Sequence, residues 1–232
     1  MKNINFNNSV AVILLLTFLN LNSLSAFAYK NLNENKLGFI QNIGQVVNQN
    51  KNIRNDIHFK LSADKNINVF IGRGKLEYLF NKLNANKTVE FNRIDVELIG
   101  YNPNAELIAL NEDEYYENYF CDWTGEKGKT AKSFQKIIYK NIYNKIDWLI
   151  YIKNNELKHE FIVHKGGNYN DITFKYSGIE NLKLNSNGNL IASTKLGVIN
   201  ENPPISFNSE NKIIPSSYLL QNNILKYKVE NN

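Results

Sequence analysis

Apolar and polar residues alternate with a period of two in many short stretches of this 232-residue chain. Residues 57–61, 93–98, 157–163 and 172–176 show the pattern, and turn-forming residues recur about every 8 to 12 positions. Because successive side chains of a strand point to opposite faces, each stretch predicts a strand with one buried and one exposed face. We therefore expect an all-β fold, an antiparallel β-sandwich.

Two features refine the strand pattern. Residues 146–152 are almost continuously apolar, which predicts a central strand covered on both faces. Glycine-rich residues 72–74 and the pair Asn187-Gly188 each predict a tight hairpin turn, because the central residues of such turns adopt positive φ.

The polar loop at residues 125–130 is the best candidate for a boundary inside the chain. The pattern leaves open whether there is one sandwich or two packed β subdomains that meet near this loop. No convincing amphipathic helix is present elsewhere, and one short helix is predicted for residues 130–136.

The first 28 residues are typical of a secretory signal peptide. Lys2 precedes an apolar stretch at residues 10–21, and Ala26 and Ala28 supply the small residues that a signal peptidase recognises. The stretch is shorter than the roughly 20 residues that a membrane-spanning helix needs. We expect cleavage after Ala28, with an uncleaved anchor as the alternative, then a linker at residues 29–36, a β module at residues 37–232 and no later membrane span.

The charges disfavour nucleic acid as a partner. The formal net charge is +5, but the 27 basic residues are scattered among 22 acidic ones and form no continuous basic run.

The single cysteine, Cys121, excludes an internal disulfide and is expected to be a buried small hydrophobe. The chain contains 42 asparagines, and we attribute this number to base composition, although asparagine also suits turns.

Two motifs resemble known ligand-binding motifs, but their residues do not have the required spacing. Residues 125–130 (GEKGKT) resemble a phosphate-binding loop but have two residues between the glycines, where that loop has four. His159 and His164 lie five positions apart, whereas a zinc-binding helix needs four. On a strand these histidines point to opposite faces, so no metal or cofactor is predicted.

No catalytic group is predicted either. Asp147, Glu160 and Asp171 would need to meet at a defined separation to act as a carboxylate pair, which the sequence does not establish. An exposed tryptophan could stack on a sugar ring. Trp148 lies in an apolar strand and is expected in the core, so Trp123 is the ligand candidate.

Several segments resemble, in order, the motifs of a known bacterial module. They are FIQNIGQV at residues 39–46, VELIGYNP at 96–103, NYF at 118–120 with Trp123 close behind, and YKNIYNKIDWLIY at 139–151. The chain is similar in these segments to an uncharacterised N-terminal β module of secreted or surface proteins that carry SBBP (seven-bladed β-propeller) repeats. The recurring positions, which we expect to be structural, are Asn42, Gly44, Gln45, Asn118, Tyr119, Tyr139, Tyr143, Ile146, Asp147, Tyr151 and Gly178.

This resemblance has departures and implications. Gln41 replaces an acid, Lys145 replaces a glycine, and the chain stops at Asn232 before the family's closing strand. The resemblance implies surface exposure, an adhesive or structural role, and downstream β-propeller or adhesion domains as partners if the chain is truncated. It supplies no catalytic residue.

We therefore expect a non-catalytic structural or interaction module of a secreted or cell-surface bacterial protein. The alternative is a carbohydrate-binding module that uses exposed aromatic residues. A glycan or a cell-surface protein is the expected class of ligand.

Overall fold

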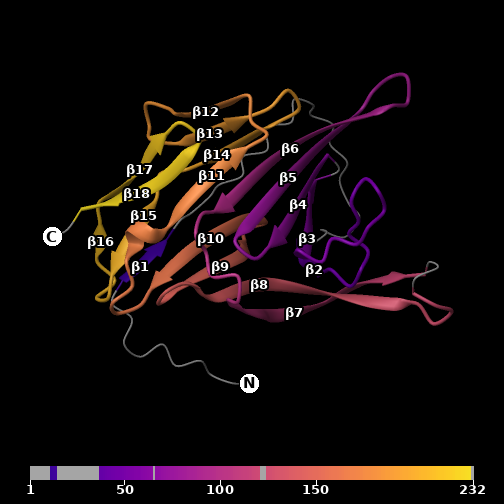
Figure 1. Ribbon diagram of the computed structural model, residues 1–232, viewed down its shortest axis with the longest axis horizontal. Helices are drawn as coiled ribbons and strands as arrows, with labels where there is room; N and C mark the ends of the chain where they lie inside the picture. The colour runs from indigo at the N-terminus through magenta and orange to yellow at the C-terminus, as the bar shows by residue number, and fades with distance from the viewer. Residues whose placement is uncertain (1–10, 15–36, 65, 121–123, 231–232) are drawn as a thin grey trace.

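The computed structural model describes residues 11–14, 37–64, 66–120 and 124–230, and these form an all-β fold (Figure 1). They contain eighteen strands and one short 3-10 helix, η1 (Tyr169–Asp171). The strands form a 15-stranded antiparallel sheet and a separate three-stranded sheet. No helix in the described part of the chain is long and apolar enough to cross a membrane.

The large sheet folds over into two packed layers. Its first half contains, in spatial order, β3 (Ile57–Asp64), β4 (Ile67–Gly72), β5 (Lys75–Leu83), β6 (Val89–Leu98), β11 (Thr173–Ser177), β18 (Ile224–Val229) and β17 (Ser216–Gln221). Its second half contains β2 (Phe39–Gln41), β8 (Lys129–Tyr143), β9 (Ile146–Lys153), β10 (Glu156–Val163), β1 (Ala11–Leu14), β15 (Ile205–Asn208) and β16 (Ile213–Ile214). Strand β7 (Glu106–Tyr119) pairs with β8 outside this order.

The three-stranded sheet lies near β11, β17 and β18 (Figure 1). It consists of β12 (Asn181–Leu184), β13 (Leu190–Ser193) and β14 (Val198–Glu201). Leu190, Ala192 and Ile199 from this sheet are buried in the same core cluster as the large sheet. The small sheet therefore extends the main core.

Aromatic side chains fill the space between the two layers. The Phe161 ring from β10 lies 5.8 Å from Phe174 of β11 and 6.4 Å from Tyr227 of β18, measured between ring centroids. On β9, Trp148 is fully buried and stacks on Phe161. Replacing one such ring with alanine costs about 3–5 kcal/mol, because the cavity collapses only in part. These contacts make the structure a β-sandwich, as the alternation predicted.

Two strand predictions are confirmed in detail. Strand β9 is central, between β8 and β10, and its first five residues are all buried. The turn after β4 joins it to β5 through Arg73 and Gly74, and Gly74 has the expected positive φ of 70°.

The helix predicted at residues 130–136 is wrong, because this segment belongs to strand β8. Ala131 and Ser133 are buried while Lys132 between them is exposed, which is the period of a strand. Partners on both sides stabilise this state, since β8 pairs with β7, β9 and β2.

Residues 125–128, near the predicted boundary, form a turn of the β7–β8 hairpin, in which the Gly128 N–H donates to the Gly125 carbonyl (3.1 Å). One core cluster contains residues from both sides of this turn, such as Val96 and Trp148.

Asparagine builds many of the turns. Among the described residues, six of the nine non-glycine residues with positive φ are asparagines. The hairpin between β12 and β13 differs from the predicted two-residue turn, because only Gly188 has positive φ and the loop covers residues 185–189. The Asn185 side chain accepts hydrogen bonds from the N–H groups of Asn187 and Asn189 (both 2.9 Å), so this asparagine stabilises a longer loop.

Candidate functional site

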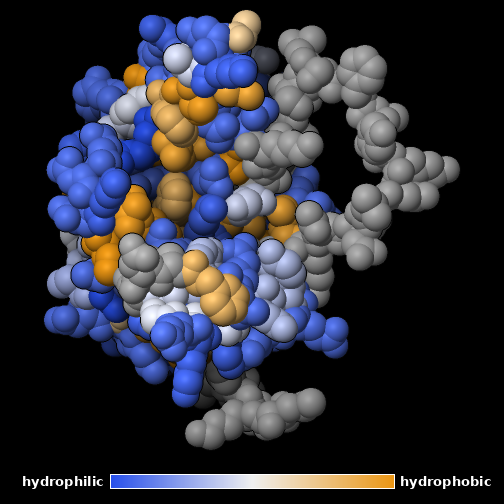
Figure 2. Space-filling model, turned by 90° about the vertical axis from the view of Figure 1, so that its right-hand side faces the viewer, coloured by the Kyte–Doolittle hydropathy of each residue, from blue (hydrophilic) through white to orange (hydrophobic). Residues whose placement is uncertain are grey.

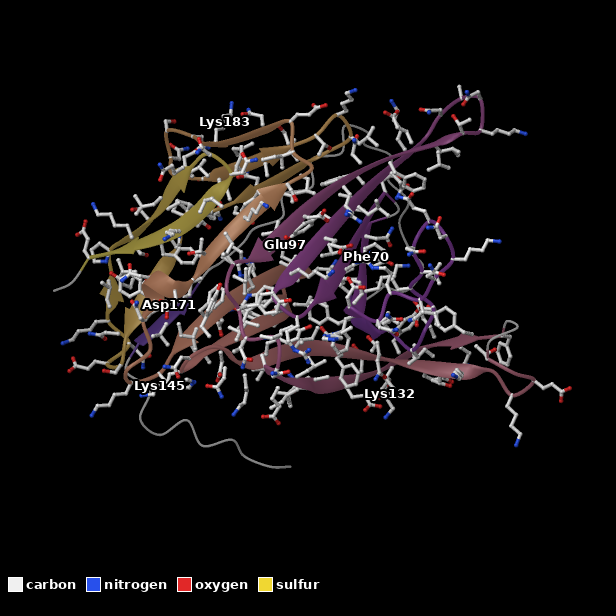
Figure 3. The ribbon with its side chains drawn as sticks, viewed as in Figure 1. Phe70, Glu97, Lys132, Lys145, Asp171 and Lys183 are labelled. Carbon is white, nitrogen blue, oxygen red and sulfur yellow. The ribbon has the colours of Figure 1, made fainter. Side chains whose placement is uncertain are left out.

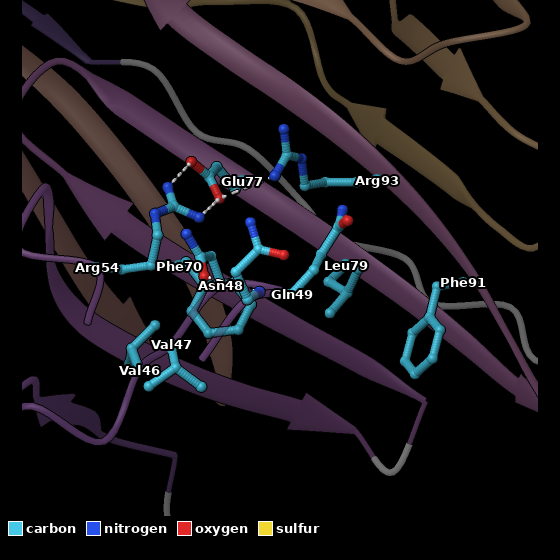
Figure 4. A pocket seen from close by; sticks show the side chains of 11 residues that line it. Val46, Val47, Asn48, Gln49, Arg54, Phe70, Glu77, Leu79, Phe91 and Arg93 are labelled. Atoms are coloured by element: carbon cyan, nitrogen blue, oxygen red, sulfur yellow. Dashed lines mark hydrogen bonds and ion pairs between the residues drawn. The ribbon is translucent and has the colours of Figure 1, made fainter. Parts of the chain in front are cut away.

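A groove opens on the outer face of β4, β5 and β6, next to the loop at residues 42–56 (Figure 4). Its volume is about 770 Å³, within the range of small-ligand sites. The loop contributes the amide side chains of Asn48, Gln49 and Asn50, and the strands contribute the apolar side chains of Phe70, Leu79 and Phe91. Amide groups on one side and apolar surface on the other therefore face the same space.

The period of the strands explains the floor of the groove. Phe70 lies opposite Glu77, and Leu79 lies opposite Arg93, in the antiparallel register of these strands. Their chain neighbours Val69 and Tyr78 are buried in the core. Because side chains alternate, the groove residues occupy the outer face of the same strands that cover the core.

One asparagine holds the loop in shape. The Asn42 side-chain amide donates to the carbonyls of Arg54 (2.9 Å) and Ile57 (2.8 Å). Its side-chain oxygen accepts from the N–H groups of Gly44 (3.0 Å) and Val46 (3.3 Å). Both ends of the loop are thus joined through a single side chain.

The next two motif positions support the same loop. Gly44 has φ of 119°, a conformation that residues with a Cβ atom rarely adopt. The Gln45 side chain accepts from the Ile43 N–H and donates to the Gln41 carbonyl (both 2.7 Å). The motif at residues 39–46 therefore supports the loop whose residues 46–50 form the wall of the groove.

A two-pronged ion pair joins the wall to the floor (Figure 4). The Arg54 guanidinium donates from Nη2 to Glu77 Oε1 (2.6 Å) and from Nη1 to Glu77 Oε2 (3.3 Å). It also donates from Nε to Asp56 Oδ1 (2.8 Å). The Lys75 ammonium contacts Asp56 and lies 3.1 Å from Glu77 Oε1. Arginine suits this place because its planar group binds a carboxylate with two parallel bonds.

These contacts fix the charges of the cluster. Burial alone would raise the pKa of Glu77, but the hydrogen bonds and charges of Arg54 and Lys75 outweigh it and lower that pKa. The Arg54 hydrogen bond likewise lowers the pKa of Asp56. Burial opposes the charge of Lys75, yet the two carboxylates raise its pKa. All four groups are therefore ionised near neutral pH.

Arg93 completes the cluster at the rim. Its guanidinium lies 2.8 Å from Asp95 and 3.8 Å from Glu77, and its side chain is about half exposed at 49%. Three basic groups, on Arg54, Lys75 and Arg93, thus face three acidic ones. The groove has little net charge and suits a neutral polar ligand better than a phosphate.

Exposed apolar residues gather on the same side of the molecule. The β5–β6 and β7–β8 hairpins extend there, with the loop at residues 42–56 between them (Figure 1). Of twelve exposed large hydrophobic residues in the described ranges, eight lie on these three segments: Val47, Ile53, Leu83, Val89, Phe91, Tyr115, Tyr116 and Phe120. Figure 2 faces this side and shows apolar residues around a hollow. Figure 3 labels Phe70 on β4 and Lys132 on the β8 extension, both on this side.

The tyrosines of the family motifs have structural hydrogen bonds. The Tyr139 hydroxyl lies 2.9 Å from His58 Nδ1, and Tyr139 is fully buried. The Tyr143 hydroxyl donates to the Ile99 carbonyl (2.9 Å). The Tyr151 hydroxyl lies 3.4 Å from Glu160. Burial raises the pKa of Tyr143 and of Tyr151 to about 12, so both hydroxyls remain protonated donors.

Asp147 organises the turn between β8 and β9. Its Oδ1 accepts from the Asn141 N–H (2.8 Å), and its Oδ2 lies 2.9 Å from His164 Nε2. In the turn itself, Lys145 has φ of 58°. That left-handed conformation is one that glycine adopts more readily than lysine.

Other motif positions have clear local roles. Ile146 is fully buried. Gly178 has φ of 73°, and a Cβ atom there would lie 2.0 Å from the Arg93 carbonyl oxygen, so only glycine fits. The Asn118 side chain accepts from the Thr130 hydroxyl (2.7 Å), and Tyr119 donates to Glu117.

Trp148 does not line the groove. Trp123 and Cys121 lie outside the described residues. Trp148 is in the core, where its Nε1–H donates to His159 Nδ1 (3.3 Å). Burial lowers the pKa of His159 to about 3, so this ring is neutral.

The acidic residues considered for catalysis have separate hydrogen-bond partners. In the described part of the chain no hydrogen bond joins any two of Asp147, Glu160 and Asp171. Burial raises the pKa of Glu160, and its one hydrogen-bond partner is Tyr151. The described residues contain no group of three or more His, Cys, Asp or Glu side chains placed to hold a metal ion.

Comparison with known proteins gives one match. Residues 39–232 match the profile of a family described as "Domain of unknown function (DUF7948)". The chain belongs to this family. The DUF7948 match begins at Phe39 and includes every groove residue. No curated protein and no solved structure matches the chain.

Sequence reasoning did not find the groove, although a signal was present. Among the opposite charges that occur two positions apart are those at Arg54 and Asp56, at Lys75 and Glu77, and at Arg93 and Asp95. On strands, residues two apart share a face, so such pairs on neighbouring strands form a ladder of charges. The pattern could have predicted a charged outer face at β5 and β6.

Proposed function

We propose that this DUF7948 chain is a non-catalytic interaction module of a secreted or cell-surface bacterial protein, and that it binds through the side that contains the groove. The gathering of exposed apolar residues supports this proposal most directly. Scattered exposed hydrophobic residues are ordinary, but a concentration of eight of twelve on one side is typical of a binding surface.

The shape and charges of this side also support binding without catalysis. The Arg54–Glu77 pair holds the loop against the sheet, so the surface is preorganised. Basic groups beside Glu77 and Asp56 lower the pKa values of these two carboxylates, whereas a catalytic acid or base needs a pKa near the working pH. We further propose export by the leader, and an architecture with downstream propeller or adhesion domains.

Binding to intact bacterial cells tests the proposal. The exported protein is labelled and its cell-bound amount is measured for the wild type and for a double variant, Phe91→Ser with Phe120→Ser. A matched control, Ile213→Ser with Leu219→Ser, removes hydrophobic residues of comparable exposure elsewhere. We expect at least a ten-fold weaker binding for the first variant and unchanged binding for the control. Equal loss in both variants, or no binding by the wild type, would contradict the proposal.

A second candidate function is carbohydrate binding in the groove. Three amide side chains, an exposed phenyl ring and a balanced set of charges suit a neutral polyhydroxylated ligand. Amides can bond the hydroxyl groups of a sugar, and the aromatic ring can stack on the apolar face of a sugar ring.

A glycan array separates the two candidates. If the ligand is a sugar in this groove, the protein binds a defined glycan class and Phe91→Ala and Asn48→Ala abolish that binding. Trp123→Ala tests the residue named from the sequence. A loss with Trp123→Ala alone would contradict the groove, and an array without signal would leave a protein surface as the ligand.

A further inference from the structure

Strand β1 lies inside the large sheet, although it comes from the predicted leader. Val12 lies opposite Ile162 of β10 on one side and Phe207 of β15 on the other, and Ile13 lies opposite Phe161 and Ser206. Both pairings are antiparallel. The spatial order is β16, β15, β1 and β10, so β1 alone connects the β15–β16 hairpin to the rest of its layer.

Several residues that border β1 are deeply buried. Phe161 and Ser206 have no exposed surface, and Val163 is 5% exposed. Removal of β1 would uncover them and leave two strand edges with unpaired N–H and C=O groups facing each other. Unpaired edges of this kind readily bind another strand.

The leader and the strand are the same residues. Cleavage after Ala28, which belongs to the proposed export of the chain, would remove Ala11–Leu14 and open a slot one strand wide between β10 and β15. The other described strands offer no replacement. Every described strand is already paired in a sheet, and residues 29–36 (YKNLNENK) contain only two apolar residues.

We propose that the slot between β10 and β15 in the processed protein binds an apolar β-strand donated by a partner polypeptide. The required chemistry follows from the strand that occupies the slot here. It is a run of four apolar residues, AVIL, without proline, and it runs antiparallel to both neighbours. Main-chain hydrogen bonds to both edges would supply affinity, and the apolar residues would supply specificity.

This inference rests on export and processing of the chain, so its test begins with the exported protein. The full-length gene is expressed in an exporting bacterium, and the mass of the exported protein shows whether residues 11–14 are still present. A fluorescent synthetic peptide of residues 7–18 (NNSVAVILLLTF) is then titrated against this protein, with anisotropy and thermal unfolding as readouts. The control peptide has Ile13→Pro, because proline cannot donate to a ladder within a sheet.

A matched pair of protein variants locates the binding. Ser206→Asp places a charge at a buried position opposite Ile13, and Ser217→Asp makes the same change at an exposed position of β17. We expect the peptide to bind the wild type and Ser217→Asp, to raise their unfolding temperature, and to bind Ser206→Asp at least ten-fold more weakly. The proline peptide should bind the wild type and Ser217→Asp at least ten-fold more weakly than the unmodified peptide does. This comparison of two peptides on the same folded protein does not depend on whether Ser206→Asp folds.

Three results would overturn the inference. The exported protein could retain residues 11–14, it could bind the two peptides equally or not at all, or it could form oligomers that the peptide dissociates. The last result would assign the slot to a second copy of this chain. Cell binding through the groove side is measured in a separate experiment. A negative result for peptide binding in the slot therefore does not contradict the proposed interaction function.

Discussion

Two buried glutamates, Glu77 and Glu201, have opposite environments. Glu77 lies under the groove and contacts Arg54, Lys75 and Arg93, and these cations lower its pKa although burial would raise it. Glu201 lies on β14 and accepts a hydrogen bond from the Tyr176 hydroxyl (3.1 Å). Burial raises the pKa of Glu201 to about 7, against the opposing effect of tyrosine hydroxyl groups.

The comparison shows that the neighbouring side chains determine whether a buried carboxyl group is ionised. The two residues are similarly buried, at 5% and 3% exposure. With cations beside it, a carboxyl group stays ionised and stabilises a surface, and with only neutral hydroxyls beside it, as at Glu201, it retains its proton up to about pH 7. The groove is thus a charged, fixed surface, whereas the region around β14 behaves as a neutral core.

The largest effect is expected from Glu77→Gln. The change leaves the Arg54 guanidinium partly buried beside a neutral group, and breaking a buried ion pair from one side costs about 3–5 kcal/mol. The free energy of unfolding in urea at pH 7 measures it. The control is Glu97→Gln, an exposed glutamate on the neighbouring strand β6, with an expected change below about 0.5 kcal/mol. A similar loss of unfolding free energy in both variants would show that the ion pairs of Glu77 do not stabilise the fold.

Glu201→Gln should instead stabilise the protein at high pH. The pKa of Glu201 is about 7 in the folded chain and 4.5 ordinarily, so the folded state binds the proton more tightly. Stability from this group is complete below pH 4.5, falls as the pH rises to about 7, and is then constant. The variant lacks this loss and should be more stable than the wild type by up to about 3 kcal/mol at pH 8. A difference independent of pH would contradict the buried protonated state.

His159 extends the comparison to a buried base without an acidic partner. Its pKa is about 3 when folded and 6.5 ordinarily, so stability from this group is lost as the pH falls from 6.5 toward 3. Between pH 7 and pH 5 the wild type should lose about 2 kcal/mol that His159→Gln does not lose. Urea unfolding at the two pH values gives this difference, and the packing cost of the substitution cancels in it. Equal losses would mean that His159 accepts a proton in the folded state.

The smallest effect is expected at the rim of the groove. Arg93 is 49% exposed and 3.8 Å from Glu77, so Arg93→Ala should cost less than about 1 kcal/mol, and less still in 0.5 M salt. Urea unfolding at low and high salt checks this. A loss as large as that of Glu77→Gln would show that Arg93, and not Arg54, neutralises the buried carboxylate.

The sequence was most informative where neighbouring residues determine the structure. The period of two correctly predicted β3, β6, β10 and β11, and the continuous apolar run predicted β9, because the burial of a strand face depends on residues close together in the chain. It was misleading at residues 130–136, where tertiary pairing with β7, β9 and β2 decided the structure. It was ambiguous at residues 11–14, because a short apolar run suits both a leader and a strand.

The groove could not be found from any one segment. Arg54 and Glu77 are 23 residues apart, and their meeting depends on how the loop at residues 42–56 folds over β5. Asn42 controls that loop, and its four hydrogen bonds join partners that the sequence does not bring together. Only the charge alternation at residues 54–56, 75–77 and 93–95 indicated a shared face.

Hydroxyl-radical footprinting of the exported protein bound to bacterial cells tests most directly whether the groove side is the binding surface. Oxidation rates are compared residue by residue between the free and the bound protein. Protection is expected at Phe91, Tyr116 and Phe120, and none at Ile213 and Leu219, which are also exposed in the free chain. Protection confined to Ile213 and Leu219, or equal rates at all five residues, would contradict binding through the groove side.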